Sequence, residues 1–84
     1  MPAPQSPITL TPEQVEELNK KLSHMRHEIN NHLSLVIAAA ELIRFKPELR
    51  EKMSATLSEQ PKRISNEMTA FSVEFEKILG IMRD

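Results

Sequence analysis

The spacing of apolar residues is the feature that most constrains how this chain folds. In both halves these residues recur at steps of three and four, which is the heptad pattern of helices that pack along one apolar stripe. In the first half the stripe comprises Val15, Leu18, Leu22, Met25, Ile29, His32, Val36, Ala39 and Ile43. In the second half it comprises Leu49, Met53, Leu57 (or Thr56), Gln60, Ile64, Met68, Phe71, Phe75, Ile78 and Met82. Because strand signals are absent, the sequence predicts an all-α fold.

Start and stop signals divide the chain into a tail and two helices. Residues 1–10 hold three of the six prolines and are expected to form a disordered, proline-rich tail. The run from Thr11 to Gln14 supplies an N-cap, a proline at the first helical position and a capping box. We therefore expect one uninterrupted helix over about 12–45, ended by Pro47. A tight turn there makes the second helix, over about 47–82, antiparallel to the first.

The second helix contains a proline in its interior. Pro61 lacks an N–H and its ring crowds the preceding turn, so we expect a kink near 61 that costs about 3 kcal/mol unless packing compensates. The apolar stripe keeps its phase across Pro61, which favours one kinked helix over two short ones. The two helices together are expected to form a single hairpin domain over residues 11–84.

Two amphipathic helices leave much of each apolar stripe open to water. A chain of 84 residues buries only a limited core, so association is a common way to complete it. We expect a homodimer in which two antiparallel hairpins make a four-helix bundle. The residues expected on the dimer and core seam are Leu18, Leu22, Met25, Ile29, His32, Val36, Ile64, Met68, Phe71 and Phe75.

Composition excludes several classes of function. The net charge is −1 with both signs interspersed, and no basic block with aromatic neighbours indicates nucleic-acid binding. With no cysteine, disulfides and thiolate metal sites are excluded. The first ten residues lack the basic start and apolar core of a signal peptide, and no apolar run approaches the roughly 20 residues of a membrane span. We therefore expect a cytoplasmic protein that does not insert into membranes.

One stretch places chemically competent side chains on the polar side of the first helix. His27 lies two residues past the seam position Met25, which puts it roughly 200° around the helix and facing water. Glu28 adjoins it, and Asn31 follows one turn later on the same face. An accessible imidazole with a carboxylate and an amide beside it is a candidate reaction centre. A lone surface histidine, however, is more often an ordinary solvated side chain without a function.

The same stretch carries a resemblance to a known family. His27-Glu28-Ile29-Asn30-Asn31, followed by Leu33, resembles the H-box of two-component sensor histidine kinases. Their dimerisation and histidine-phosphotransfer (HisKA-like) domain is a dimeric helical hairpin. The second half, with Pro47-Glu48-Leu49-Arg50-Glu51 and then Gln60 to Ile64, is similar to that domain's second helix, so the resemblance covers about residues 12–83. Many family members carry proline where this chain has His32, so the first helix is expected to lack that kink.

The resemblance implies roles and partners. It makes His27 the phosphoacceptor and Glu28 its acid–base partner, and gives Asn31 the task of orienting water when a partner's aspartyl phosphate is hydrolysed. The implied function is a phosphotransfer module that exchanges phosphate with the aspartate of a response-regulator receiver domain. The chain has a single glycine and no glycine-rich loop, so no nucleotide cofactor is expected. Phosphate would come from a separate or linked kinase ATP-binding domain.

His24 lies one turn before His27, so the two could in principle bind a metal ion together, but that face offers no third ligand except Glu28. His32 follows His27 at a spacing of five, not the four of helical zinc motifs, so a zinc site is not expected. His32 lies on the seam and is expected to hydrogen-bond across the bundle. The alternative to phosphotransfer is a homodimeric helical interaction module without catalysis, which would regulate a kinase or another partner.

Overall fold

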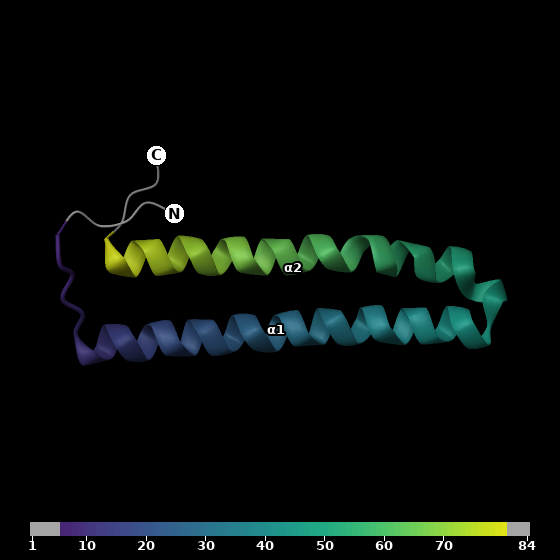
Figure 1. Ribbon diagram of the computed structural model, residues 1–84, viewed down its shortest axis with the longest axis horizontal. Coiled ribbons are helices and arrows are strands. Elements are labelled where there is room, and N and C mark those ends of the chain that lie inside the picture. The colour runs from purple at the N-terminus through teal and green to yellow at the C-terminus, as the bar shows by residue number, and fades with distance from the viewer. Residues whose placement is uncertain (1–5, 81–84) are drawn as a thin grey trace.

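The protein forms two long helices that pack against each other along their length. The computed structural model describes residues 6–80. Its elements are α1 (Pro12–Phe45), a short 3-10 helix η1 (Pro47–Leu49) and α2 (Arg50–Leu79). Figure 1 shows α1 and α2 side by side and antiparallel, joined at one end of the molecule by η1. The predicted all-helical fold with two packed helices is confirmed.

The start of α1 follows the local chemistry of the sequence. Thr11 is extended, with φ −75° and ψ 159°, and its hydroxyl accepts a hydrogen bond from the Gln14 N–H at 3.1 Å. The Thr11 N–H donates in return to Gln14 Oε1 at 2.8 Å. This reciprocal capping box satisfies two of the donors that a helix start leaves free. Pro12 occupies the first turn, where its missing N–H costs nothing.

The turn differs in detail from the expected second helix. Lys46 leaves helical geometry, with φ −134° and ψ 79°, because the ring of Pro47 disfavours a helical residue before it. A 3-10 turn follows, closed by the Leu49 N–H donating to the Lys46 carbonyl at 2.9 Å. The α-helix therefore begins at Arg50 instead of at residue 47.

The far end of α2 also differs from the expectation of a helix to about residue 82. Gly80 adopts the left-handed conformation, with φ 69° and ψ 24°, and its N–H donates to the Lys77 carbonyl at 3.2 Å. Glycine enters this region without steric cost, so it ends the helix at Leu79. Met82, and residues 1–5 of the expected tail, lie outside the described residues.

Pro61 lies inside α2, and the helix continues through it. The α2 ribbon is unbroken and inclines gently towards the turn at its N-terminal end (Figure 1). The apolar stripe keeps its phase on both sides, because Gln60 is buried and Ile64, one turn later, is half-buried. Packing against α1 on both sides of Pro61 thus holds the two segments as one helix, as the phase of the stripe predicts.

The interface between α1 and α2 follows the apolar stripes closely. On α1, the stripe positions from Leu18 to Ile43 are half-buried except Ala39, which is fully buried at 2% exposed. Val15 and Met68 depart from this pattern, since they are 52% and 53% exposed. Met68 is expected on the dimer and core seam, and within one hairpin it remains more than half exposed. In residues 6–80, Ala39 is the sole apolar residue that is fully buried, so one hairpin does not close a core.

Large apolar side chains accordingly remain on the outside of the hairpin. Those of α1 and α2 more than a third exposed are Val15, Leu33, Leu35, Ile37, Leu42, Phe45, Met68 and Val73. Ile37 is 63% exposed and Phe45 is 73% exposed. Among the described helices, none is both long and apolar enough to cross a lipid bilayer.

Candidate functional site

His27 lies near the middle of α1 and is exposed to solvent. Its neighbours on the apolar stripe, Met25 and Ile29, are half-buried against α2, so the imidazole stands on the opposite side of the helix. Within residues 6–80, the His27 side chain makes no hydrogen bond or ion pair. Its ring nitrogens are therefore accessible to another molecule, on a backbone held by many turns of regular helix.

Asn31 lies on the same outward face. It is exposed and follows His27 by four residues, which brings its side chain above the imidazole with one turn between them. Both residues sit in the interior of α1, far from its ends at Pro12 and Phe45. The two side chains thus form an open, polar strip that a flat or concave partner surface can reach.

The Glu28 side chain lies towards α2 and not, as expected, beside His27. Its side chain is half-buried, and its carboxylate lies close to His32 on α1 and Glu67 on α2. It makes no hydrogen bond with His27 among the described contacts. Successive residues on a helix diverge by 100°, so a carboxylate next to an outward histidine lies at the flank, where it can turn towards the neighbouring helix.

His32 bridges the two helices. Its Nδ1 lies 2.7 Å from Oε1 of Gln60 on α2, and the contact is partly buried. Since an amide oxygen only accepts, Nδ1 carries the proton and donates. Gln60 is 7% exposed, and this bond satisfies its buried oxygen. The expectation that His32 hydrogen-bonds across the helices is confirmed within one hairpin.

Glu28, His32 and Glu67 form a compact cluster, which we call the Glu-His-Glu cluster. One possible ligand atom from each of the three lies within 4.8 Å of the others, and all three residues are half-buried. Sequence reasoning missed Glu67, because it flanks the α2 stripe and becomes a neighbour of Glu28 only when the two helices align. His24, the other histidine considered for metal binding, is exposed and outside this cluster.

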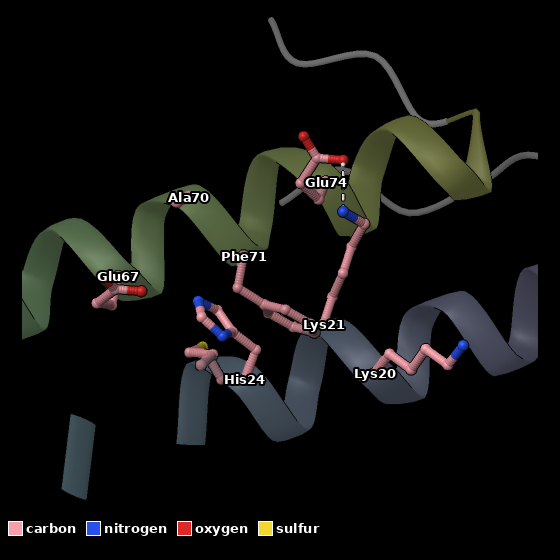
Figure 2. Close-up of a pocket in the computed structure, with 8 residues that line it drawn as sticks. Lys20, Lys21, His24, Glu67, Ala70, Phe71 and Glu74 are labelled. Atoms are coloured by element: carbon pink, nitrogen blue, oxygen red, sulfur yellow. Dashed lines mark ion pairs between the residues drawn. The ribbon is translucent and has the colours of Figure 1, made fainter. Parts of the chain in front are cut away.

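A groove adjoins the cluster on the side towards the open end of the hairpin. It has a volume of about 270 Å³, and its lining includes Lys21, His24, Glu67 and Phe71. Figure 2 shows Lys21 and His24 reaching from α1 towards α2, where Lys21 Nζ lies 3.5 Å from Glu74 Oε2. The groove is shallow and carries charges of both signs, so its chemistry indicates no single ligand class.

Comparison with known proteins leaves the chain without a family assignment. No protein-family model matches it, and neither a curated protein nor a solved structure is significantly similar to it. What the protein does must therefore be argued from its own residues.

Proposed function

We propose that this protein is a histidine phosphoacceptor module that exchanges a phosphoryl group with the aspartate of a receiver domain. The observation that carries the proposal is the position of His27, an exposed and unpaired imidazole in the middle of a long helix that is packed against a second one. The surrounding His27 to Asn31 run resembles the H-box of sensor histidine kinases. A helical hairpin is the architecture that this resemblance implies.

The proposed step is a displacement at phosphorus. A neutral ring nitrogen of His27 attacks the phosphorus atom, the new N–P bond forms, and the bond from phosphorus to the donor's oxygen or nitrogen breaks. The other ring nitrogen then loses its proton to a carboxylate or to water. Glu28 is the carboxylate nearest in sequence. To accept that proton its side chain must turn from α2 to the outer face, which a half-buried glutamate does by changing rotamer.

Asn31 has a proposed role in removing phosphate from the receiver. When a receiver aspartate carrying phosphate docks over His27, the exposed Asn31 amide, one turn away, can hold a water molecule in line with the acyl phosphate. Hydrolysis then releases inorganic phosphate and restores the aspartate. No nucleotide is consumed in that step. Phosphate for the forward reaction comes from a separate or linked kinase domain.

The proposal includes a homodimer. A single hairpin leaves Leu33, Ile37 and Met68 between 45% and 63% exposed, and it fully buries only Ala39 among the apolar residues described. A second hairpin that covers these side chains would turn two amphipathic helices into a four-helix bundle. At 100° per residue, Leu33 and Ile37 lie about 120° and about 80° around α1 from His27, so a dimer that covers them leaves the imidazole accessible. We place the module in the cytoplasm, where receiver domains and kinase domains meet.

A second candidate function rests on the same exposed apolar side chains and on the direction of Glu28. If Glu28 never turns to His27, the hairpin serves as a homodimeric interaction module that regulates a kinase or another partner without chemistry. In that case seam substitutions abolish dimerisation and partner binding together, whereas His27→Ala changes neither.

The deciding experiment is phosphorylation of the purified protein by phosphoramidate, read by intact-mass spectrometry. We expect one acid-labile phosphate per chain on the wild type and on the His24→Ala control, which removes another exposed histidine of α1. We expect none on His27→Ala. A folded His27→Ala variant that still accepts phosphate would overturn the assignment, and so would a folded wild type that accepts none.

A further inference from the structure

The Glu-His-Glu cluster has the composition and placement of a metal site. We infer that Glu28, His32 and Glu67 bind a divalent transition-metal ion, of which Zn²⁺ is the representative, and that this ion links α1 to α2. Glu28 and His32 are four residues apart on one face of α1, and Glu67 comes from the opposite helix. The inference goes beyond phosphotransfer and does not depend on it.

The spacing of the three groups fits an ion between them. Their ligand atoms lie within 4.8 Å of one another, yet no hydrogen bond or ion pair joins the side chains of any two of the three residues. Zinc bonds to nitrogen and carboxylate oxygen are about 2.0–2.2 Å long, which separates tetrahedral ligand atoms by about 3.4 Å. Long glutamate side chains close that difference by small rotations, without movement of either helix.

Gln60 prepares His32 for this role. The hydrogen bond from Nδ1 to Gln60 Oε1 fixes the proton on Nδ1 and leaves Nε2 with a free lone pair. Metal-binding histidines in proteins nearly always donate their second ring N–H in this way, which sets the tautomer and the orientation of the ring. Gln60 is almost wholly buried, so the contact is built into the interface between the helices.

The electrostatics of the cluster favour a cation. Glu28 and Glu67 are half-buried carboxylates that face the same small space, and like charges at this separation repel. Among the residues described, neither forms an ion pair with a lysine or arginine. Both lysines of the groove are already paired: Lys20 with Glu16 at 3.5 Å, and Lys21 with Glu17 at 4.0 Å and Glu74 at 3.5 Å. A divalent ion would neutralise both carboxylates at once.

The ligand set also selects the class of metal. One imidazole and two carboxylates suit Zn²⁺ and its neighbours in the first transition row, whereas Mg²⁺ and Ca²⁺ prefer oxygen ligands alone. Three protein ligands leave a fourth position to water. Because the cluster is half-buried at the flank of the helix pair, solvent reaches that position.

The test is a metal titration of the whole chain, with ZnCl₂ followed by calorimetry against a competing chelator and CoCl₂ followed by visible absorption. We expect one ion per chain, an intense four-coordinate cobalt spectrum, and little response to MgCl₂. Zinc should also raise the melting temperature by several degrees, because it binds the folded hairpin and not the separated helices. One ion shared by two chains would contradict a site within the hairpin.

Variants separate this site from ordinary surface binding. Glu67→Gln keeps size and shape but removes a charge, and we expect it to weaken Zn²⁺ binding at least about tenfold and to abolish the cobalt spectrum. Glu74→Gln makes the same change about two turns further along α2, and this variant and His24→Ala should both bind Zn²⁺ as the wild type does. Helicity measured by circular dichroism confirms that each variant is folded. Equal zinc affinity in Glu67→Gln and wild type would overturn the inference.

Discussion

Two pairs of residues on α1 have the same four-residue spacing but differ in their exposure and in their contacts. His27 and Asn31 are four apart and face solvent, and the imidazole has no hydrogen bond or ion pair within residues 6–80. Glu28 and His32 are also four apart, but they are half-buried and meet Gln60 and Glu67 of α2. A shift of one residue rotates a pair by 100°, and this alone moves it from the outer surface to the flank between two helices. His27 and Asn31, the outer pair, are placed to contact a partner protein. Glu28 and His32, the inner pair, contact α2 of the same hairpin.

The largest effect that the comparison predicts is on phosphate acceptance. His27→Ala removes the outer nucleophile, so the acid-labile phosphate should disappear completely. The melting temperature should stay within about 1 °C of wild type, because exposed substitutions that break no contact change stability by less than ~0.5 kcal/mol. Thermal unfolding and intact-mass spectrometry on the same sample measure both. A large loss of stability would show that His27 is not on the outside.

The next largest effect is on the free energy of unfolding, and it concerns Ile29, a residue of the apolar stripe that lies in sequence between the residues of the two pairs. Ile29→Asp places a charge on the half-buried stripe and should cost about 3 kcal/mol or more, enough to unfold much of the protein. Asn30→Asp is the matched control, because it introduces the same carboxylate one residue later at an exposed position. Circular dichroism during urea unfolding compares them. Similar losses in both variants would mean that the stripe does not determine packing.

The inner pair predicts a smaller loss. Gln60→Ala leaves the Nδ1–H of His32 without its acceptor and should lower the free energy of unfolding by about 1–3 kcal/mol. His32→Ala removes the other partner, and the double variant should lose less than the sum of the two single losses. A double-mutant cycle in urea measures the coupling. Additive losses would show that the 2.7 Å contact contributes nothing.

The sequence was informative about local structure and about the outer pair. The capping residues Thr11 and Gln14, the break at Pro47 and the phase of the apolar stripe depend on neighbours within a few residues, so each could be read directly. Whether His27 faces outward follows from that phase alone. The sequence predicts a second helix from about residue 47, whereas α2 begins at Arg50. Pro47 begins a 3-10 segment instead, and local sequence rules do not determine how long such a segment is.

The sequence predicts only part of the surroundings of the inner pair. The sequence predicts that His32 reaches across the helices and that Glu28 lies beside His27, but within the first helix alone His32 has no set of metal ligands around it. Glu67 comes within reach only through the relative alignment of α1 and α2, which depends on the length and geometry of the turn at η1. Pairing between helices is a property of the assembled hairpin, so no pattern within one helix could supply it.

The smallest predicted effect connects the two pairs through Glu28, and it rests on both proposals. A Zn²⁺ ion on the inner cluster would hold the Glu28 carboxylate towards α2, away from the His27 ring whose proton it is proposed to accept. Saturating zinc should therefore slow phosphorylation of the wild type by phosphoramidate about threefold to tenfold, less than a lost general base usually costs because water also accepts the proton. At the zinc concentration that just saturates the wild type, Glu67→Gln should show normal phosphorylation and a clearly smaller response to zinc. If zinc slows Glu67→Gln as much as wild type, the metal acts on the phosphate donor or on His27 directly, and the two pairs work independently.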